Sequence, residues 1–121
     1  MKISDSEKHI MDILWQDSPK TANTIVDAID PTLQWQDKTV KTLINRLLKK
    51  DAIGYEKAGR EYRYYPILLQ DEFIAIETDN FLHKVFDGNV SHLIAAFAQK
   101  EKLTEQEISD LKAIVRSMDD D

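Results

Sequence analysis

Residues 35–66 read WQDKTVKTLINRLLKKDAIGYEKAGREYRYYP, and they contain the clearest structural pattern of the chain. In the first half of this stretch, apolar residues recur at the spacing that places them on one face of a helix: Val40, Leu43, Ile44, Leu47 and Leu48. Its second half contains two β-prone runs, residues 53–58 and 61–65, separated by a turn signal at Gly59-Arg60. We therefore predict an amphipathic helix that ends near Lys50 and is followed by a β-hairpin.

Two further helices are predicted before this stretch. Ser4 and Glu7 form a capping box ahead of an apolar run, which indicates a helix over about residues 5–17. Thr21 is a second cap, and the apolar residues after it are spaced for a helix through about Ile29. Three helices followed by a β-hairpin are typical of a winged helix-turn-helix domain, which presents its third helix and its hairpin, the wing, to DNA.

The polar face of the third helix carries the candidate DNA-contacting residues. They are Lys38, Thr39, Lys41, Thr42, Asn45 and Arg46. Arginine pairs with guanine through two hydrogen bonds, asparagine pairs with adenine, a threonine methyl contacts thymine, and lysine neutralises phosphate. Such charges also fit an ordinary solvated helix face, and it is the position of this face beside the hairpin that favours DNA contact.

The predicted wing alternates aromatic and charged residues. Its candidate DNA contacts are Lys57, Arg60 and Arg63, with Arg60 at the tip of the turn. Side chains alternate between the two faces of a strand, so Tyr62 and Tyr64 share one face. We expect these two tyrosines to pack the hairpin onto the third helix rather than to contact DNA.

Residues 70–121 return to helical spacing and are predicted to form three helices, with breaks near Asp87-Gly88 and before Thr104. Their apolar residues exceed what three peripheral helices would bury, although the same stripes also fit a cover for the back of the winged domain. We assign a homodimer interface to Ile74, Phe81, Leu82, Val85, Phe86, Leu93, Ile94 and Phe97.

The predicted fold class is therefore mainly α with a small β-hairpin. It comprises an N-terminal winged helix-turn-helix DNA-binding domain over residues 1–69 and a C-terminal three-helix dimerisation domain over residues 70–121. A two-fold dimer presents two identical third helices, which match an inverted repeat in double-stranded DNA.

Charge is distributed unevenly along the chain. The 121 residues carry a net charge of −6, but residues 1–70 sum to +1 and residues 71–121 to −7. Between Lys38 and Arg63 there are eight Lys or Arg residues against three acidic residues. Only the first part of the chain can lie against polyanionic DNA without strong repulsion.

Several classes of protein are disfavoured by what the sequence lacks. There is no Cys, which excludes disulfides and thiolate metal sites, and the three His are scattered without helical pairing. No catalytic motif is present, so we predict neither an enzyme nor a bound metal or cofactor. The N-terminus has no signal-peptide pattern, and no apolar run approaches the roughly 18 residues of a membrane span. We expect a cytoplasmic protein without a membrane partner.

Several segments of the chain resemble one known family. Residues 10–15 (IMDILW), 38–47 (KTVKTLINRL) and 62–65 (YRYY) are similar to the penicillinase-repressor family, also called BlaI/MecI/CopY. The similarity continues through residues 80–88 (NFLHKVFDG) and 103–111 (LTEQEISDL), so it covers nearly the whole chain. The resemblance implies a winged helix, a helical domain that intertwines two subunits, and operator binding that blocks transcription of β-lactamase, methicillin-resistance or copper-export operons.

The resemblance also carries over to single residues of the third helix. The family's recognition-helix contacts fall on Lys38, Thr39, Lys41, Thr42 and Arg46. The Ser-Pro that often precedes this segment in the family is replaced by Gln36-Asp37, which changes the contacts at the helix start. Operators with TACA-like half-sites are implied by the resemblance alone.

Two departures from the family concern how repression is relieved. The copper-responsive branch ends in a Cys-rich metal motif, and the absence of Cys excludes thiolate-based copper sensing here. The antibiotic-responsive branch is inactivated by cleavage of an Asn-Phe bond in a dimerisation helix, and the matching bond is Ala96-Phe97. An inactivating protease is thus an implied partner, while the changed residue before the bond leaves open whether this chain is cut.

Together, these features predict a dimeric, sequence-specific transcriptional repressor that binds an inverted-repeat operator in double-stranded DNA. Two alternatives stay open at this point. One is a winged-helix module that uses the same basic face on an acidic protein partner. The other is a regulator that responds to a small ligand held between its two domains.

Overall fold

The computed structural model describes residues 1–101 and 104–119. Residues 102, 103, 120 and 121, which belong to the predicted second domain, lie outside the described residues. The chain divides into two compact units, Met1–Phe73 and the residues from Ile74 onward.

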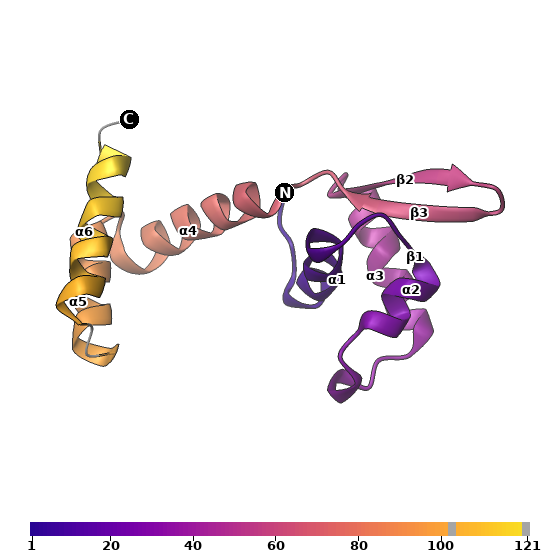
Figure 1. The fold of residues 1–121 in the computed structure, drawn as a ribbon, viewed down its shortest axis with the longest axis horizontal. Helices are drawn as coiled ribbons and strands as arrows, with labels where there is room; N and C mark the ends of the chain where they lie inside the picture. Colours follow the sequence, from indigo (N-terminus) through magenta and orange to yellow (C-terminus); the bar gives the residue numbers. More distant parts are fainter. Residues whose placement is uncertain (102–103, 120–121) are drawn as a thin grey trace. The chain divides into compact units, whose positions relative to one another are not determined.

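The first unit contains three α-helices and a small antiparallel sheet. Figure 1 shows the helices on one side of the sheet, with the hairpin extending beyond them. Its elements are α1 (Asp5–Gln16), β1 (Lys20–Thr21), α2 (Ala22–Ala28), a 3-10 helix η1 (Pro31–Leu33), α3 (Asp37–Lys49), β2 (Ile53–Ala58) and β3 (Glu61–Pro66). The predicted fold class, mainly α with a small hairpin, is confirmed.

The first two helices begin at the predicted caps. At α1, the Ser4 hydroxyl accepts a hydrogen bond from the Glu7 backbone N–H at 3.1 Å, and the Glu7 carboxylate accepts one from the Ser4 N–H at 2.9 Å. At α2, the Thr21 hydroxyl accepts from the Thr24 N–H at 3.2 Å. Each bond satisfies a backbone donor that a helix start leaves without an intrahelical partner.

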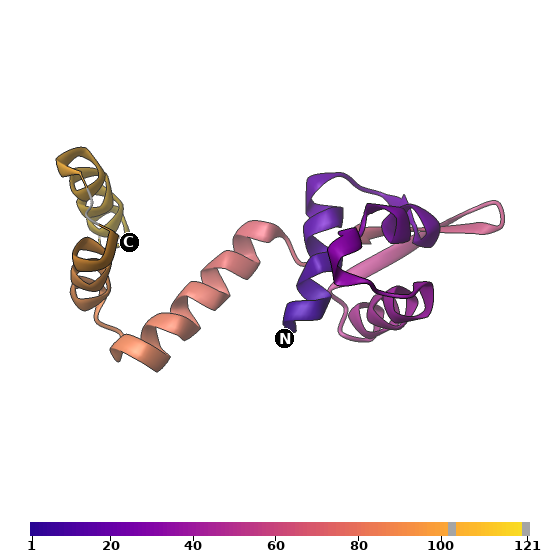
Figure 2. The same ribbon diagram turned by 90° about the horizontal axis from the view of Figure 1, so that it is seen from below.

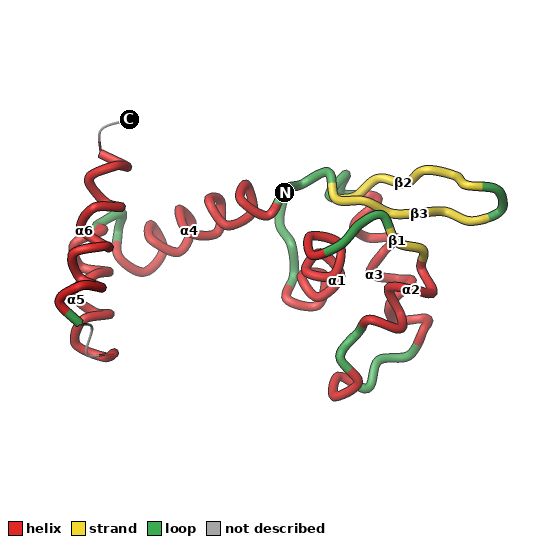
Figure 3. Tube along the Cα trace, in the orientation of Figure 1, coloured by secondary structure: helices red, strands yellow, loops and turns green. Residues whose placement is uncertain are grey.

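The sheet contains a strand that the sequence did not predict. Its strand order is β1-β3-β2, and β1 adds Lys20 opposite Tyr64 and Thr21 opposite Arg63. Figure 3 shows this short strand beside the hairpin. A two-residue strand has no periodicity to detect, so only its long-range pairing reveals it. The 3-10 helix between α2 and α3 was likewise not predicted.

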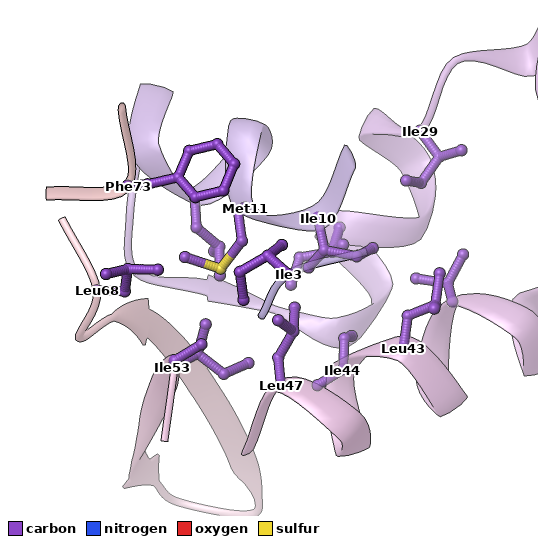
Figure 4. Packing of buried hydrophobic residues seen from close by; sticks show 14 residues of the cluster. Ile3, Ile10, Met11, Ile29, Leu43, Ile44, Leu47, Ile53, Leu68 and Phe73 are labelled. Atoms are coloured by element: carbon purple, nitrogen blue, oxygen red, sulfur yellow. The ribbon is translucent and has the colours of Figure 1, made fainter. Parts of the chain in front are cut away.

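One hydrophobic core holds the three helices and the sheet together. The side chains that face it from α1, α3 and β2 are 0–4% exposed, and they include Ile10, Met11, Leu14, Val40, Leu43, Ile44, Leu47 and Ile53. Figure 4 shows the residues of α1 lying over those of α3. Burying each side chain of this size contributes about 1.5–3 kcal/mol. This core fixes which face of α3 points inward.

An ion pair between buried Glu7 and partly exposed Lys50 joins the start of α1 to the end of α3. The side chain of Glu7 is 2% exposed, and the Lys50 ammonium donates hydrogen bonds to its carboxylate and, at 2.8 Å, to the Lys2 carbonyl. Burial raises the pKa of Glu7, but hydrogen bonds from Lys50 and Ser4 outweigh this effect and leave the pKa below its usual value. The pair therefore stabilises the folded first unit while Glu7 is ionised.

The first turn of α4 (Gln70–Phe86) belongs to the core of the first unit. Phe73 is 8% exposed, and its ring lies 5.3 Å, centroid to centroid, from that of Trp15 on α1. The Trp15 indole N–H also donates a hydrogen bond to the Leu68 carbonyl at 2.8 Å. Through these contacts, the segment from Leu68 to Phe73 packs against Trp15 of α1.

The second unit consists of the rest of α4 together with α5 (Val90–Glu101) and α6 (Glu105–Asp119). The break after α4 lies at the predicted Asp87-Gly88, where φ is positive at both residues (51° and 83°). The Gly88 N–H donates to the Leu82 carbonyl at 3.0 Å, which closes the helix end. Thr104 and Glu107 form the capping hydrogen bonds of α6.

No helix within residues 1–101 and 104–119 is long and apolar enough to cross a membrane.

Replacing Glu7 with Gln tests the Glu7–Lys50 ion pair. We expect Glu7→Gln to lower the free energy of unfolding at pH 7 by about 2 kcal/mol, because it leaves the Lys50 charge without its partner. Both Trp residues, Trp15 and Trp35, lie in the first unit, so tryptophan fluorescence during urea denaturation reports on this unit. Glu56→Gln, which removes an exposed carboxylate from the hairpin, is the matched control.

The lowered pKa of Glu7 predicts that the stabilisation by the ion pair depends on pH. The Glu7 pKa is lower in the folded than in the unfolded chain, so the stabilisation is fully present above the unfolded pKa and is lost as the pH falls through the folded pKa. The difference in stability between the wild-type chain and Glu7→Gln should therefore shrink toward acid pH. A difference that stays constant down to pH 3 would contradict the assignment.

Candidate nucleic-acid interface

The start of α3 has no side-chain cap. Asp37 is the first residue of the helix, and Gln36 occupies the cap position without a side-chain hydrogen bond. The helix depends instead on its apolar stripe, whose four buried residues, Val40, Leu43, Ile44 and Leu47, are at most 4% exposed. Because the stripe faces the core, the opposite side of α3 is open to solvent.

All six residues predicted to contact DNA from α3 are exposed on this open side. At 3.6 residues per turn, Lys38, Thr42 and Asn45 follow the middle of the exposed face. Lys41 lies at one edge, and Thr39 and Arg46 lie at the other. We call this surface, with the exposed Lys49, the α3 face.

One of these residues already uses its hydroxyl hydrogen. The Thr42 Oγ1 donates a hydrogen bond to the Lys38 carbonyl at 2.9 Å, within the helix. Its methyl group and the oxygen lone pairs are left for a ligand. Thr42 is therefore equipped for the methyl contact that the sequence suggested, and it has no hydroxyl hydrogen free to donate.

The register of the hairpin separates its three candidate cations. Residues directly opposite each other in an antiparallel pair point to the same face, and Lys57 lies opposite Tyr62 while Arg63 lies opposite Glu56. The face with Tyr62 also carries Ile53, which is buried in the core, so we call it the inner face. Lys57 lies on the inner face and Arg63 on the outer face, whereas Arg60 lies in the turn.

The two tyrosines that were expected to pack onto α3 behave differently. Tyr64 is half-buried against the core, as predicted, and this burial raises its pKa. Tyr62 is 46% exposed, and its ring packs edge to face with Tyr55 at 5.0 Å. Tyr62 lines hollows beside Lys41 and Asn45 of α3, so it lies next to the helix, but it is not buried against it as the packing prediction requires. The hairpin itself extends beyond the helices, as Figures 1 and 2 show.

The fold adds residues of α2 that the sequence did not point to. A surface hollow of about 170 Å³ lies between α2, α3 and β3. It is lined by Thr21, Ala22, Asn23, Lys41, Glu61, Tyr62 and Tyr64. No motif marks Asn23, which comes close to Lys41 only because α2 packs against α3 and β3.

The predicted dimer residues leave much apolar surface uncovered in a single chain. Ile74, Phe81, Val85 and Phe97 are each 48–54% exposed. The other four predicted residues, Leu82, Phe86, Leu93 and Ile94, are half-buried, and none of the described side chains from Ile74 onward is fully buried. The second unit thus has no closed core of its own among its described residues.

An apolar groove runs between α5 and α6. It has a volume of about 410 Å³ and is lined by Leu93, Ile94, Phe97, Glu107, Asp110, Leu111 and Ile114. Ala96 and Phe97, which flank the bond that matches the family's cleavage site, are both exposed on α5. As for metals, the described residues contain no group of three or more His, Cys, Asp or Glu that could hold an ion.

Comparison with known proteins identifies the family. The model of the penicillinase repressor family matches residues 3–117. The chain belongs to the penicillinase repressor family.

Two curated members of this family illustrate the similarity. The chain is 33% identical over 118 residues to a penicillinase repressor of Staphylococcus aureus, covering 98% of this chain and 94% of the relative. It is also 33% identical over 114 residues to the methicillin resistance regulatory protein MecI of Mammaliicoccus sciuri, covering 94% of this chain and 93% of the relative.

A solved structure of the penicillinase repressor family provides the structural comparison. It is the solution structure of monomeric BlaI of Bacillus licheniformis in complex with the blaP half-operator. The match has a TM-score of 0.52 and 32% sequence identity, and it covers 60% of this chain and 88% of that chain. A winged-helix repressor fold is thus shared with this family member.

Because the start of α3 has no side-chain cap, we expect that adding one would stabilise this penicillinase repressor family member. Gln36→Ser should raise the free energy of unfolding by about 0.5–1 kcal/mol, because a serine hydroxyl can accept a hydrogen bond from a backbone N–H in the first turn. Gln36→Ala is the matched control and should give no increase. Urea denaturation followed by tryptophan fluorescence measures both, and equal stabilities would contradict the prediction.

Proposed function

We propose that this chain is a sequence-specific DNA-binding transcriptional repressor that acts as a homodimer on an inverted-repeat operator. The observation that carries the proposal is the α3 face, an exposed and cationic surface in a member of the penicillinase repressor family. The BlaI neighbour was solved with a half-operator, so this arrangement has a family precedent for binding DNA.

In this proposal, α3 enters the major groove. Arg46, Asn45 and the Thr42 methyl are suited to contact base edges, while Lys38 and Lys41 neutralise phosphates. The turn residue Arg60 and the inner-face residue Lys57 would reach the DNA beside the groove. Arg63 lies on the outer face, so any contact that it makes would be with a different part of the DNA backbone.

We further propose that residues 1–69 form the DNA-binding domain and that residues 70–121 dimerise. The α5–α6 groove and the exposed apolar residues of α4 have matching chemistry, and a second copy is a partner that supplies both surfaces at once. The Glu107 and Asp110 carboxylates border the groove and would remain at the polar rim of such an interface.

Repression follows from this geometry by occlusion. A dimer bound across two half-sites near a promoter would compete with RNA polymerase for the same DNA. Because each protomer reads one half-site, the affinity for the complete operator depends on dimerisation.

Relief of repression by proteolysis is also part of the proposal. A cut at the Ala96-Phe97 bond would sever α5 within the helix that lines the groove. Dimerisation would then weaken and the operator would be released. In a single chain this bond lies between two exposed residues, whereas a second copy seated in the groove would cover Phe97.

The DNA-binding proposal is tested by fluorescence anisotropy with DNA from upstream of this protein's own gene. We expect sequence-selective binding that weakens steeply as salt rises. Lys41→Ala and Arg46→Ala should each lower the affinity about 5- to 150-fold, and Lys41→Ala should also reduce the salt slope by about 1. These changes remove a phosphate contact and a base contact respectively.

The matched control for these variants is Lys8→Ala, which removes one positive charge from α1. A shuffled DNA of the same length controls for non-specific binding. Equal affinity for the two DNAs, or unchanged affinity in both α3 variants, would contradict the proposal and favour an acidic protein partner for this face.

The dimer proposal predicts that Leu93→Glu gives a monomer in sedimentation velocity, because it places a charge in the α5–α6 groove. Its affinity for a complete inverted repeat should fall at least about 10-fold, while its affinity for a single half-site stays unchanged. Ala95→Glu adds the same charge to α5 at a residue that does not line the groove. A wild-type chain that sediments as a monomer when bound to DNA would contradict the proposal.

A further inference from the structure

The hollow between α2, α3 and β3 brings three different hydrogen-bond donors together. Asn23 contributes a side-chain amide from α2, Lys41 an ammonium from α3, and Tyr62 a phenol from the wing. All three residues are exposed, so their polar groups are accessible to a ligand. The Thr21 hydroxyl and the half-buried Tyr64 also line the hollow, and the Thr21 hydroxyl is hydrogen-bonded to the Thr24 N–H and hydroxyl. Asn23, Lys41 and Tyr62 are the exposed side-chain donors of the hollow.

This combination of groups suits a phosphate diester of DNA. Phosphate oxygens accept hydrogen bonds from Lys, Asn and Tyr side chains, and such contacts fix the position of a protein on the duplex. The ammonium of Lys41 supplies the positive charge that attracts a phosphate, and the neutral donors of Asn23 and Tyr62 can orient it through directional hydrogen bonds. The one carboxylate bordering the hollow belongs to Glu61, which shares its strand face with Arg63, the outer face.

The ring of Tyr62 packs on a neighbouring ring of the hairpin. It packs edge to face with Tyr55 at 5.0 Å, and it stands opposite Lys57 in the strand pair. A second hollow, of about 230 Å³, is lined by Asn45, Leu48, Tyr55, Tyr62 and Tyr64. Tyr62 therefore shares one hollow with Lys41 and another with Asn45 of the α3 face, and its packing on Tyr55 reduces the side-chain freedom that binding would cost.

We infer that Tyr62 and Asn23, together with Lys41, hold one backbone phosphate of the bound DNA, so that the interface extends from α3 onto α2 and the inner face of the wing. This inference rests on the proposed function, because it names further contacts of the same DNA-binding surface. It assigns Tyr62 a role in binding that the alternation of the strand alone had assigned to packing.

The test uses the full chain and the upstream DNA of the anisotropy titration. Tyr62→Phe removes only the hydroxyl and keeps the ring that packs on Tyr55, and Asn23→Ala removes the amide. Each should lower the affinity about 3- to 10-fold. A phosphate carries no sequence information. The affinity should therefore fall by the same factor for the upstream DNA and for the shuffled DNA.

Tyr65→Phe is the matched control. It removes a hydroxyl from the same strand, but Tyr65 lies on the outer face, where its ring covers Gly54. We expect its affinity to equal that of the wild-type chain. Tryptophan fluorescence of each variant verifies that the first unit is folded.

A scan with single methylphosphonate linkages locates the contact. At the phosphate held by this hollow, neutralising the linkage should abolish the difference between wild type and Tyr62→Phe, while the difference persists at every other linkage. Wild-type affinity in both Tyr62→Phe and Asn23→Ala, with Lys41→Ala still impaired, would overturn the inference and leave the proposed function standing. Absence of DNA binding by the wild-type chain would instead overturn the proposed function, and the inference with it.

Discussion

The burial of the apolar stripe of α3 is the interaction on which the rest of the molecule depends. Leu47 and Ile44 pack against α1 and the base of the hairpin, and both are at most 2% exposed. Rotating α3 to bury its polar face would place several charges in a low-dielectric core, at a cost of many kcal/mol. The same packing that stabilises the first unit therefore also determines which side chains can meet a ligand. Stability and recognition use opposite faces of one helix.

In the wing, buried and exposed residues are separated along the length of the hairpin, whereas in α3 they lie on opposite faces of the helix. Its base is part of the core through Ile53 and Tyr64, whereas Tyr55, Lys57 and Tyr62 continue the inner face as exposed residues, and Tyr55 and Tyr62 line a hollow beside Asn45 and Leu48 of α3. A strand that continues past its core keeps its alternation, but its side chains are no longer buried. Aromatic residues at such positions are held by each other and remain available for binding.

The second unit is organised differently, because a single copy does not bury its apolar side chains. Its described helices expose Phe81, Val85 and Phe97 by about half, and the α5–α6 groove is open. Exposed apolar surface of this kind is costly in water and is typical of a surface that a partner covers. In the proposed function this links DNA binding to assembly, since the partner that completes the second unit also supplies the second α3 face.

Local patterns in the sequence predict the α-helices, the hairpin and the exposed residues of α3, because periodicity, capping and turn signals are local properties of the chain. How these elements pack against one another depends on the tertiary fold. The two-residue strand β1, the separation of Lys57 from Arg63 and the exposure of Tyr62 follow from strand register and from where the core ends. The hollow that joins Asn23 to Lys41 and Tyr62 depends on contacts between distant segments, which no local pattern encodes.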